Sequence, residues 1–208
     1  MSPAPDEATD EVLMIRFQRG DRTAFTSLVR RHQTPLFNFA LRQLGAQAVA
    51  EEVVQDTFVR VVQNATEFKH EARFTTWVYT ILRNLCIDQL RRRALRRHPS
   101  LDERSRSSSR SGGEEGPTLL EQTADTRASV EREATSIELK EKIARAVETL
   151  PEEQKEVFLL REISNLPFKE IAEITRVPEN TVKSRMRYAL ERLQQALCDY
   201  EEYARALR

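Results

Sequence analysis

Residues 73–93 read RFTTWVYTILRNLCIDQLRRR. Large apolar side chains recur there at the i, i+3, i+4, i+7 spacing of an amphipathic helix with one buried face: Phe74, Trp77, Val78, Ile81, Leu82 and Leu85. The remaining face carries hydroxyls, an aromatic ring, an amide and guanidinium groups: Thr75, Thr76, Tyr79, Arg83, Asn84 and the arginines at 91–93. Such groups suit stacking on unpaired bases and binding phosphates. The simpler alternative is a core helix whose terminal arginines complement the helix dipole.

Composition favours an all-helical chain. Its 208 residues allow one medium or two small domains, and it has only five glycines. Lys and Arg together number 33 and so do Asp and Glu, whereas a self-sufficient DNA-binding protein usually carries a basic excess. Between residues 83 and 97, however, six arginines accompany a single acid, Asp88. We therefore expect contact with nucleic acid that depends on a partner protein.

Several classes of protein are not expected. No apolar run approaches the ~20 residues of a membrane span, and the acidic N-terminus is no signal peptide, so we expect a cytoplasmic protein without membrane insertion. Cys86 and Cys198 lack metal-ligand spacing, so we expect no metal site and no cofactor. Glu52 and Asp56 are one helical turn apart but lack a third ligand, so a nuclease or recombinase is not expected.

The N-terminal part reads as a series of helices. The first spans Asp10 to Gly20, a second kinks or restarts at Pro35 and ends at Gly45, and a third spans 46–62 with Val53, Val54, Thr57, Phe58, Val61 and Val62 inward. The polar face of the third helix would usually be only solvated. The connection 63–73 contains Phe68, Lys69 and His70, and it is either a hydrophobic plug or a base-contacting loop.

Residues 98–136 are rich in Ser, Gly, Pro and mixed charge, which predicts a flexible linker between domains at 1–97 and 137–208. In the second domain, a short helix (168–174), a tight turn (175–178) and a longer helix predict a helix-turn-helix. The longer helix directs Val182, Met186, Ala189, Leu190, Leu193 and Leu197 inward. Its outer face carries the candidate base and phosphate contacts: Asn180, Thr181, Lys183, Ser184, Arg185, Arg187 and Tyr188.

Taken together, these segments resemble the sigma-70 family of RNA polymerase sigma factors, in its extracytoplasmic-function (ECF) group. The resemblance rests on AVAEEVVQDTFVRVV (48–62), on residues 73–93, on the helix-turn-helix segment 150–193 and on their order. It implies that the first domain (region two) binds the β′ clamp helices of core RNA polymerase through Glu52, Gln55 and Asp56. The second domain (region four) would read the −35 promoter element and contact the β flap.

The resemblance also implies that the segment from Phe68 to Arg93 melts the −10 element and holds its unpaired strand. The implied −10 contacts are Phe68, Lys69, His70, Arg73, Thr76, Trp77, Arg83, Asn84, Arg91 and Arg92. An anti-sigma protein would be the controlling partner. The alternative is a stand-alone helix-turn-helix regulator, which would explain residues 150–193 but leave Trp77, Asn84 and the arginines without a role.

Overall fold

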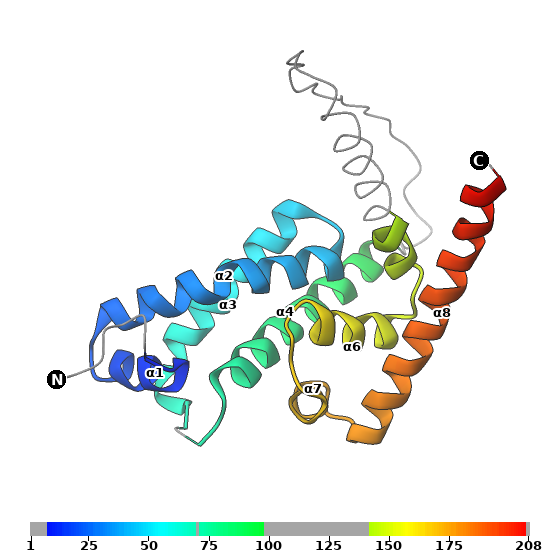
Figure 1. Cartoon of the computed structure of the whole chain (residues 1–208). Helices are drawn as coiled ribbons and strands as arrows, with labels where there is room; N and C mark the ends of the chain where they lie inside the picture. The colour runs from blue at the N-terminus through cyan, green and yellow to red at the C-terminus, as the bar shows by residue number, and fades with distance from the viewer. Residues whose placement is uncertain (1–7, 70, 98–141, 207–208) are drawn as a thin grey trace, which may run out of the picture.

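The computed structural model describes residues 8–69, 71–97 and 142–206. Within these ranges every regular element is a helix, which confirms the all-α prediction. The helices form two groups, an N-terminal group in blue to green and a C-terminal group in yellow to red (Figure 1). The predicted linker at 98–136 lies outside the described residues.

The N-terminal group contains α1 (Asp10–Gln18), α2 (Arg22–Leu44), α3 (Gln47–Gln63), the 3₁₀ turn η1 (Ala65–Glu67) and α4 (Phe74–Arg97). Asp21 begins α2 by accepting hydrogen bonds from the backbone N–H groups of Thr23 and Ala24. Of the kink or restart expected at Pro35, the restart does not occur: the helix continues, because the residues on either side supply enough buried surface to hold it. It ends at Gly45, whose φ of +69° is the left-handed conformation that glycine adopts without strain.

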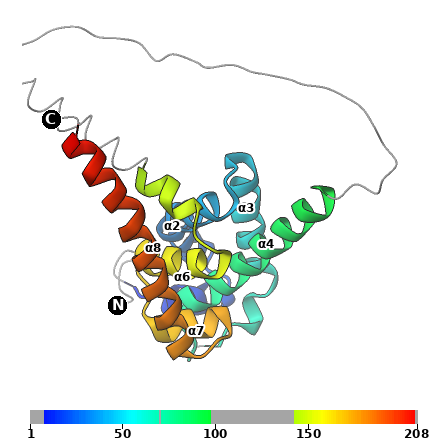
Figure 2. The same ribbon diagram turned by 90° about the vertical axis from the view of Figure 1, so that its right-hand side faces the viewer.

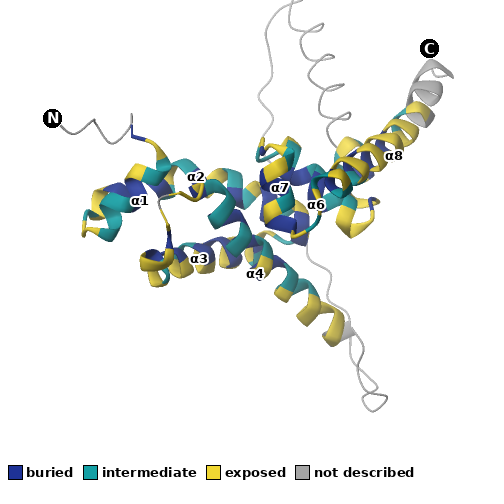
Figure 3. Ribbon diagram, turned by 90° about the horizontal axis from the view of Figure 1, so that it is seen from below, coloured by how far each residue is buried: buried dark blue, intermediate teal, exposed yellow. Residues whose placement is uncertain are grey.

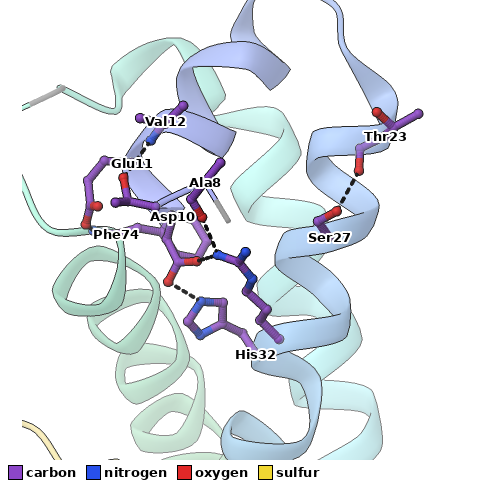
Figure 4. A network of polar contacts seen from close by, with 10 residues as sticks. Ala8, Asp10, Glu11, Val12, Thr23, Ser27, His32 and Phe74 are labelled. Atoms are coloured by element: carbon purple, nitrogen blue, oxygen red, sulfur yellow. Dashed lines mark hydrogen bonds and ion pairs between the residues drawn. The ribbon is translucent and has the colours of Figure 1, made fainter. Parts of the chain in front are cut away.

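Helix α1 connects α2 and α4 at one end of the N-terminal group through side-chain hydrogen bonds (Figure 4). Asp10 accepts hydrogen bonds from Arg31 (2.9 Å) and pairs with the ring of His32 (2.7 Å), both on α2. The neighbouring Glu11 accepts from the backbone N–H of Phe74 (3.1 Å), the first residue of α4. One turn of α1 therefore fixes the start of α4 against α2.

The apolar stripe of α4 forms much of the core. Phe74, Val78 and Leu82 are fully buried, as the spacing predicted. Tyr79 was expected on the outer face but is only 2% exposed and packs edge-on against Phe39 (ring centroids 5.8 Å apart). Burial raises the pKa of its phenol to about 12.

The C-terminal group contains a helix at 142–148, α6 (Glu152–Glu162), α7 (Phe168–Thr175) and α8 (Glu179–Ala206). Helices α7 and α8 form the predicted helix-turn-helix, and the turn is made by Arg176 in the left-handed conformation (φ 58°). Val182, Met186, Ala189 and Leu193 face inward as expected. Leu190 was also expected inward but is 48% exposed, as is Val62 on α3 at 45%. Each lies on the rim of its apolar stripe, where a neighbouring helix no longer covers it.

The two groups pack against each other. Helix α7 lies on α4 and α6 lies on α2, so the buried residues of both groups form one continuous cluster. Figure 2 shows α6 and α7 with α8 along their outer side, and Figure 3 shows the C-terminal turns of α4 extending, exposed, beyond this body.

Candidate nucleic-acid and protein interfaces

Helix α4 is exposed mainly over its C-terminal turns (Figure 3). Of the predicted −10 residues, Lys69, Asn84, Arg91 and Arg92 are exposed, and the side chain of Arg73 is 73% exposed. Arg93 differs from its neighbours because its guanidinium donates to the carbonyl of Leu44 (3.1 Å), which ties α4 to the end of α2. His70 lies outside the described residues.

Phe68 and Trp77 lie together beside the start of α4. Phe68 is 4% exposed, and its ring centroid lies 5.3 Å from Trp77 and 6.1 Å from Phe74. Of the two alternatives for this loop, the burial of the Phe68 ring favours the hydrophobic plug. The ring is held there because the apolar start of α4 offers it a buried site. Trp77 is only half-buried, so part of its ring is accessible.

The loop before α4 is fixed by a side chain that sequence reasoning missed. The amide of Gln18 at the end of α1 donates to the carbonyl of Ala65 (2.6 Å) and to that of Phe68 (2.9 Å). No periodic signal marks this residue, because its partners are backbone atoms 47 and 50 positions away.

Carboxylates of the second group bind three of the predicted −10 residues, of which Arg73 stays exposed. Arg83 donates to Glu156 of α6 through Nε (2.6 Å) and Nη2 (3.2 Å). Thr76 donates to Glu170 of α7 (2.9 Å), which also pairs with Arg73 (3.3 Å). Neither glutamate was a candidate from sequence, where each resembles an ordinary acid on an amphipathic helix.

The outer face of α8 matches its prediction closely. Asn180, Lys183, Ser184, Arg187 and Tyr188 are exposed near the N-terminal half of the helix. The guanidinium of Arg187 lies 4.9 Å from the centre of the Tyr188 ring, so these two side chains form a cation–π pair, the Arg187–Tyr188 unit. Thr181 and Arg185 are half-buried, and Arg185 pairs with Glu153 of α6 (2.5 Å).

The predicted polymerase-facing residues of α3, Glu52, Gln55 and Asp56, are all exposed. Val59 continues the same helical face and is 51% exposed. Val59 was not a candidate from the sequence. The signal was present nevertheless, since Val59 is an apolar residue outside the buried stripe of α3. These residues form the α3 face (Glu52, Gln55, Asp56 and Val59), which combines two carboxylates with one exposed valine.

Among the described residues, no cluster of three or more histidines, cysteines or carboxylates could hold a metal ion. Within the same part of the chain, no helix has the length and hydropathy needed to cross a membrane. Cys86 is buried and Cys198 is exposed. Burial and the nearby charges of Glu156 and Glu152 raise the pKa of the Cys86 thiol to about 12, so it stays protonated at neutral pH.

Two family models match the chain. Sigma-70 region 2 matches residues 28–96, and Sigma-70 region 4 matches residues 140–193. Among solved structures, CnrH in complex with the cytosolic domain of CnrY shares the fold at a TM-score of 0.63 and 22% identity, over 91% of this chain and 97% of that one. The sigma factor RpoE in complex with the anti-sigma factor NepR from Bartonella quintana shares it at a TM-score of 0.61 and 24% identity, over 83% and 96%.

Curated relatives are more similar in sequence. The ECF RNA polymerase sigma factor SigW of Bacillus subtilis is 31% identical over 88% of this chain and 93% of its own length. The ECF RNA polymerase sigma-E factor of Escherichia coli K12 is 33% identical over 89% and 93%. With both regions matched in order and relatives of this identity along nearly the whole length, the chain belongs to the ECF group of the sigma-70 family of RNA polymerase sigma factors.

Proposed function

We propose that this chain binds core RNA polymerase and directs promoter-specific initiation by recognising the −35 element and melting the −10 element. The observation that carries the proposal is the pairing of two exposed nucleic-acid-type surfaces in one chain. Helix α4 carries Asn84, Arg91 and Arg92 exposed, and α8 carries the outer face of a helix-turn-helix. A stand-alone regulator needs only the second surface.

For the −10 element, the proposed contacts follow the exposed side of α4 and the loop before it. Arginines and Lys69 would bind phosphates, while the open edge of Trp77, Thr76 and Asn84 would hold unpaired bases. Unstacking a base costs a few kcal/mol, which stacking and hydrogen bonds to the protein must offset. Phe68 would act from beneath, by supporting the Trp77 ring at 5.3 Å.

For the −35 element, the N-terminal half of α8 would enter the major groove. Asn180, Ser184 and the Arg187–Tyr188 unit would face base edges, while Lys183 and Arg185 would contact phosphates. We assign these roles to a region-four domain at 137–208 and the −10 roles to a region-two domain at 1–97, with 98–136 as the linker. The family models, matched at 28–96 and 140–193, support this division.

For polymerase, we assign the α3 face to the β′ clamp helices and the region-four domain to the β flap. The near-zero net charge supports the need for this partner, because the chain alone has little long-range attraction for DNA. The chain would act in the cytoplasm as an initiation factor and not as a catalyst. An anti-sigma protein is its proposed regulator. The solved structure of RpoE contains the anti-sigma factor NepR, and that of CnrH contains the cytosolic domain of CnrY.

The test is a pull-down of core RNA polymerase followed by transcription from a promoter library. We expect a stable complex and start-site-specific transcripts that core enzyme alone does not make. Tight promoter binding without polymerase, and no new transcripts, would instead identify a stand-alone helix-turn-helix regulator. Core enzyme with no added factor and core enzyme with an unrelated helix-turn-helix protein are the controls.

A further inference from the structure

Two carboxylates of the second group are buried. Glu156 on α6 and Glu170 on α7 are each 7% exposed. Such residues are almost never buried without partners, because desolvating an unpaired charge is costly. Their burial therefore needs a specific explanation.

All the hydrogen-bond and ion-pair partners of these two carboxylates among the described residues lie on α4 or directly before it. Glu156 binds the Arg83 guanidinium by two bonds, of 2.6 and 3.2 Å. Glu170 accepts from Thr76 (2.9 Å) and Thr75 (3.3 Å) and pairs with Arg73 (3.3 Å). Among the described residues neither side chain is bonded within its own group, so they serve the contact between groups and not the fold of the second group.

The partners on α4 are groups that also bind nucleic-acid phosphates. A guanidinium fork and hydroxyl donors match any planar or tetrahedral oxyanion, carboxylate or phosphate alike. The two carboxylates bind α4 at Thr76 and at Arg83. These positions are about two helical turns apart, or roughly 10 Å along the helix axis. Arg73, Thr76 and Arg83 are three of the proposed −10 contacts.

The contact between the groups also accompanies the burial of side chains on the same side of α4. Tyr79 is 2% exposed and Cys86 1% exposed, although both lie on the side of α4 that meets the second group. Glu156 of α6 binds Arg83, which lies one helical turn before Cys86 on the same side of α4. The carboxamide of Gln43 on α2 adds a further bond across the boundary, to Glu152.

We infer that this α4 surface is the docking site of the chain's own second domain, whose Glu156 and Glu170 occupy the N-terminal half of the −10 site in the free protein. Promoter DNA and the second domain then compete for the same guanidinium and hydroxyl groups. Asn84, Arg91 and Arg92 stay exposed, so the competition covers only part of the site. The identity of the displaced ligand as −10 DNA rests on the proposed function, whereas the docking itself does not.

The test compares the full-length chain with E156Q/E170Q. Glu162→Gln/Glu173→Gln is the matched control, because it removes the same charge from exposed positions on the same two helices that make no bond to α4 among the described residues. Separation of the domains is measured by electron-spin distance between labels on Cys198 and on Gln33→Cys, both exposed, in chains that also carry Cys86→Ala, because opening would uncover this buried thiol. Binding is measured with a fluorescent single-stranded DNA pool of mixed sequence.

We expect E156Q/E170Q to lengthen the label distance and to bind the DNA about tenfold more tightly than wild type, with the control unchanged. A tenfold gain corresponds to a wild-type chain that is closed about 90% of the time. If E156Q/E170Q melts early, the shortened pair E156D/E170D keeps both charges but draws them back from α4, and it should shift both readouts in the same direction.

The outcomes separate the two proposals. An unchanged label distance in both variants overturns the docking, whatever the DNA does. A longer distance without tighter DNA binding supports the docking and overturns the assignment of this surface to −10 DNA. Equal tightening in the control would show a general charge effect and would also overturn the docking as the cause of weak DNA binding.

Discussion

Gln18 is the single residue on which the geometry of the loop before α4 depends most clearly. Its amide bridges two carbonyls at the start and end of η1, at Ala65 and Phe68. The Ala65 carbonyl also accepts from the Phe68 N–H, whereas Gln18 is the one partner of the Phe68 carbonyl among the described residues. Loss of the amide therefore releases the end of the loop that leads to Lys69 and Arg73.

We expect Gln18→Ala to lower the free energy of unfolding by about 1–2 kcal/mol, since a net hydrogen bond contributes about 0.5–1.5 kcal/mol. It should impair promoter opening, measured by permanganate reactivity of the −10 strand, while leaving polymerase affinity unchanged. Gln33→Ala, an exposed glutamine on α2, is the control and should change stability by less than about 0.5 kcal/mol. Equal loss of opening and polymerase binding would argue that Gln18 supports the whole domain and not this loop.

At the scale of single helices, α3 has a face that its fold does not use. Val59 is 51% exposed beside Gln55 and Asp56, so it adds apolar area to a carboxylate-bearing surface. We expect Val59→Asp to weaken core polymerase binding at least tenfold, about 1.4 kcal/mol, with little change in melting temperature. Val12→Asp, at an exposed valine of α1, should leave binding intact. Wild-type affinity for Val59→Asp would remove this residue from the interface.

The C-terminal turns of α4 give a second prediction at this scale. Arg91 and Arg92 are exposed on the part of α4 that extends beyond the body of the molecule (Figure 3). If each binds a phosphate, Arg91→Ala/Arg92→Ala should weaken promoter complexes and reduce the slope of log K against log salt by about 0.7–0.9 per lost contact. Arg93→Ala is the contrasting variant, because that guanidinium binds the Leu44 carbonyl and its loss should affect stability more than salt dependence.

Helical periodicity was enough to predict most of the elements. It located the α4 stripe, the α7–α8 pair and the end of α2 at Gly45, because these depend on local spacing and backbone preference. It failed at Tyr79, which belongs to no stripe of α4 and is buried against Phe39 instead. It also failed at Phe68, where a loop residue without any period fills the core beside Phe74.

The candidate site was predictable for the residues that contact solvent and not for those that contact the other group. The outer faces of α8 and α3 followed directly from their helical wheels. Glu156 and Glu170 could not be found in this way, because their partners lie 73 to 97 positions earlier in the chain. Two acids on amphipathic helices carry no local sign that they will be buried.

For the molecule as a whole, the closed arrangement leaves the α3 face exposed while it covers the start of α4. If the α3 face is the polymerase-binding surface, as proposed, polymerase can engage the closed chain through α3 before any DNA is present. Positioning the second domain at the β flap would then separate the carboxylates of Glu156 and Glu170 from Arg83 and Thr76. Binding of polymerase would in this way supply the free energy that opens the −10 site.

We expect core polymerase alone, without DNA, to lengthen the distance between labels on Cys198 and Gln33→Cys to the value expected for E156Q/E170Q. The reason is that a partner which binds only the separated domains shifts the population toward them, and 99:1 opening from a 90% closed chain requires roughly a thousandfold preference. Val59→Asp, which should bind polymerase weakly, is the control and should keep the short distance at the same polymerase concentration. A short distance in a polymerase complex that is already fully formed would mean that DNA, and not polymerase, separates the domains.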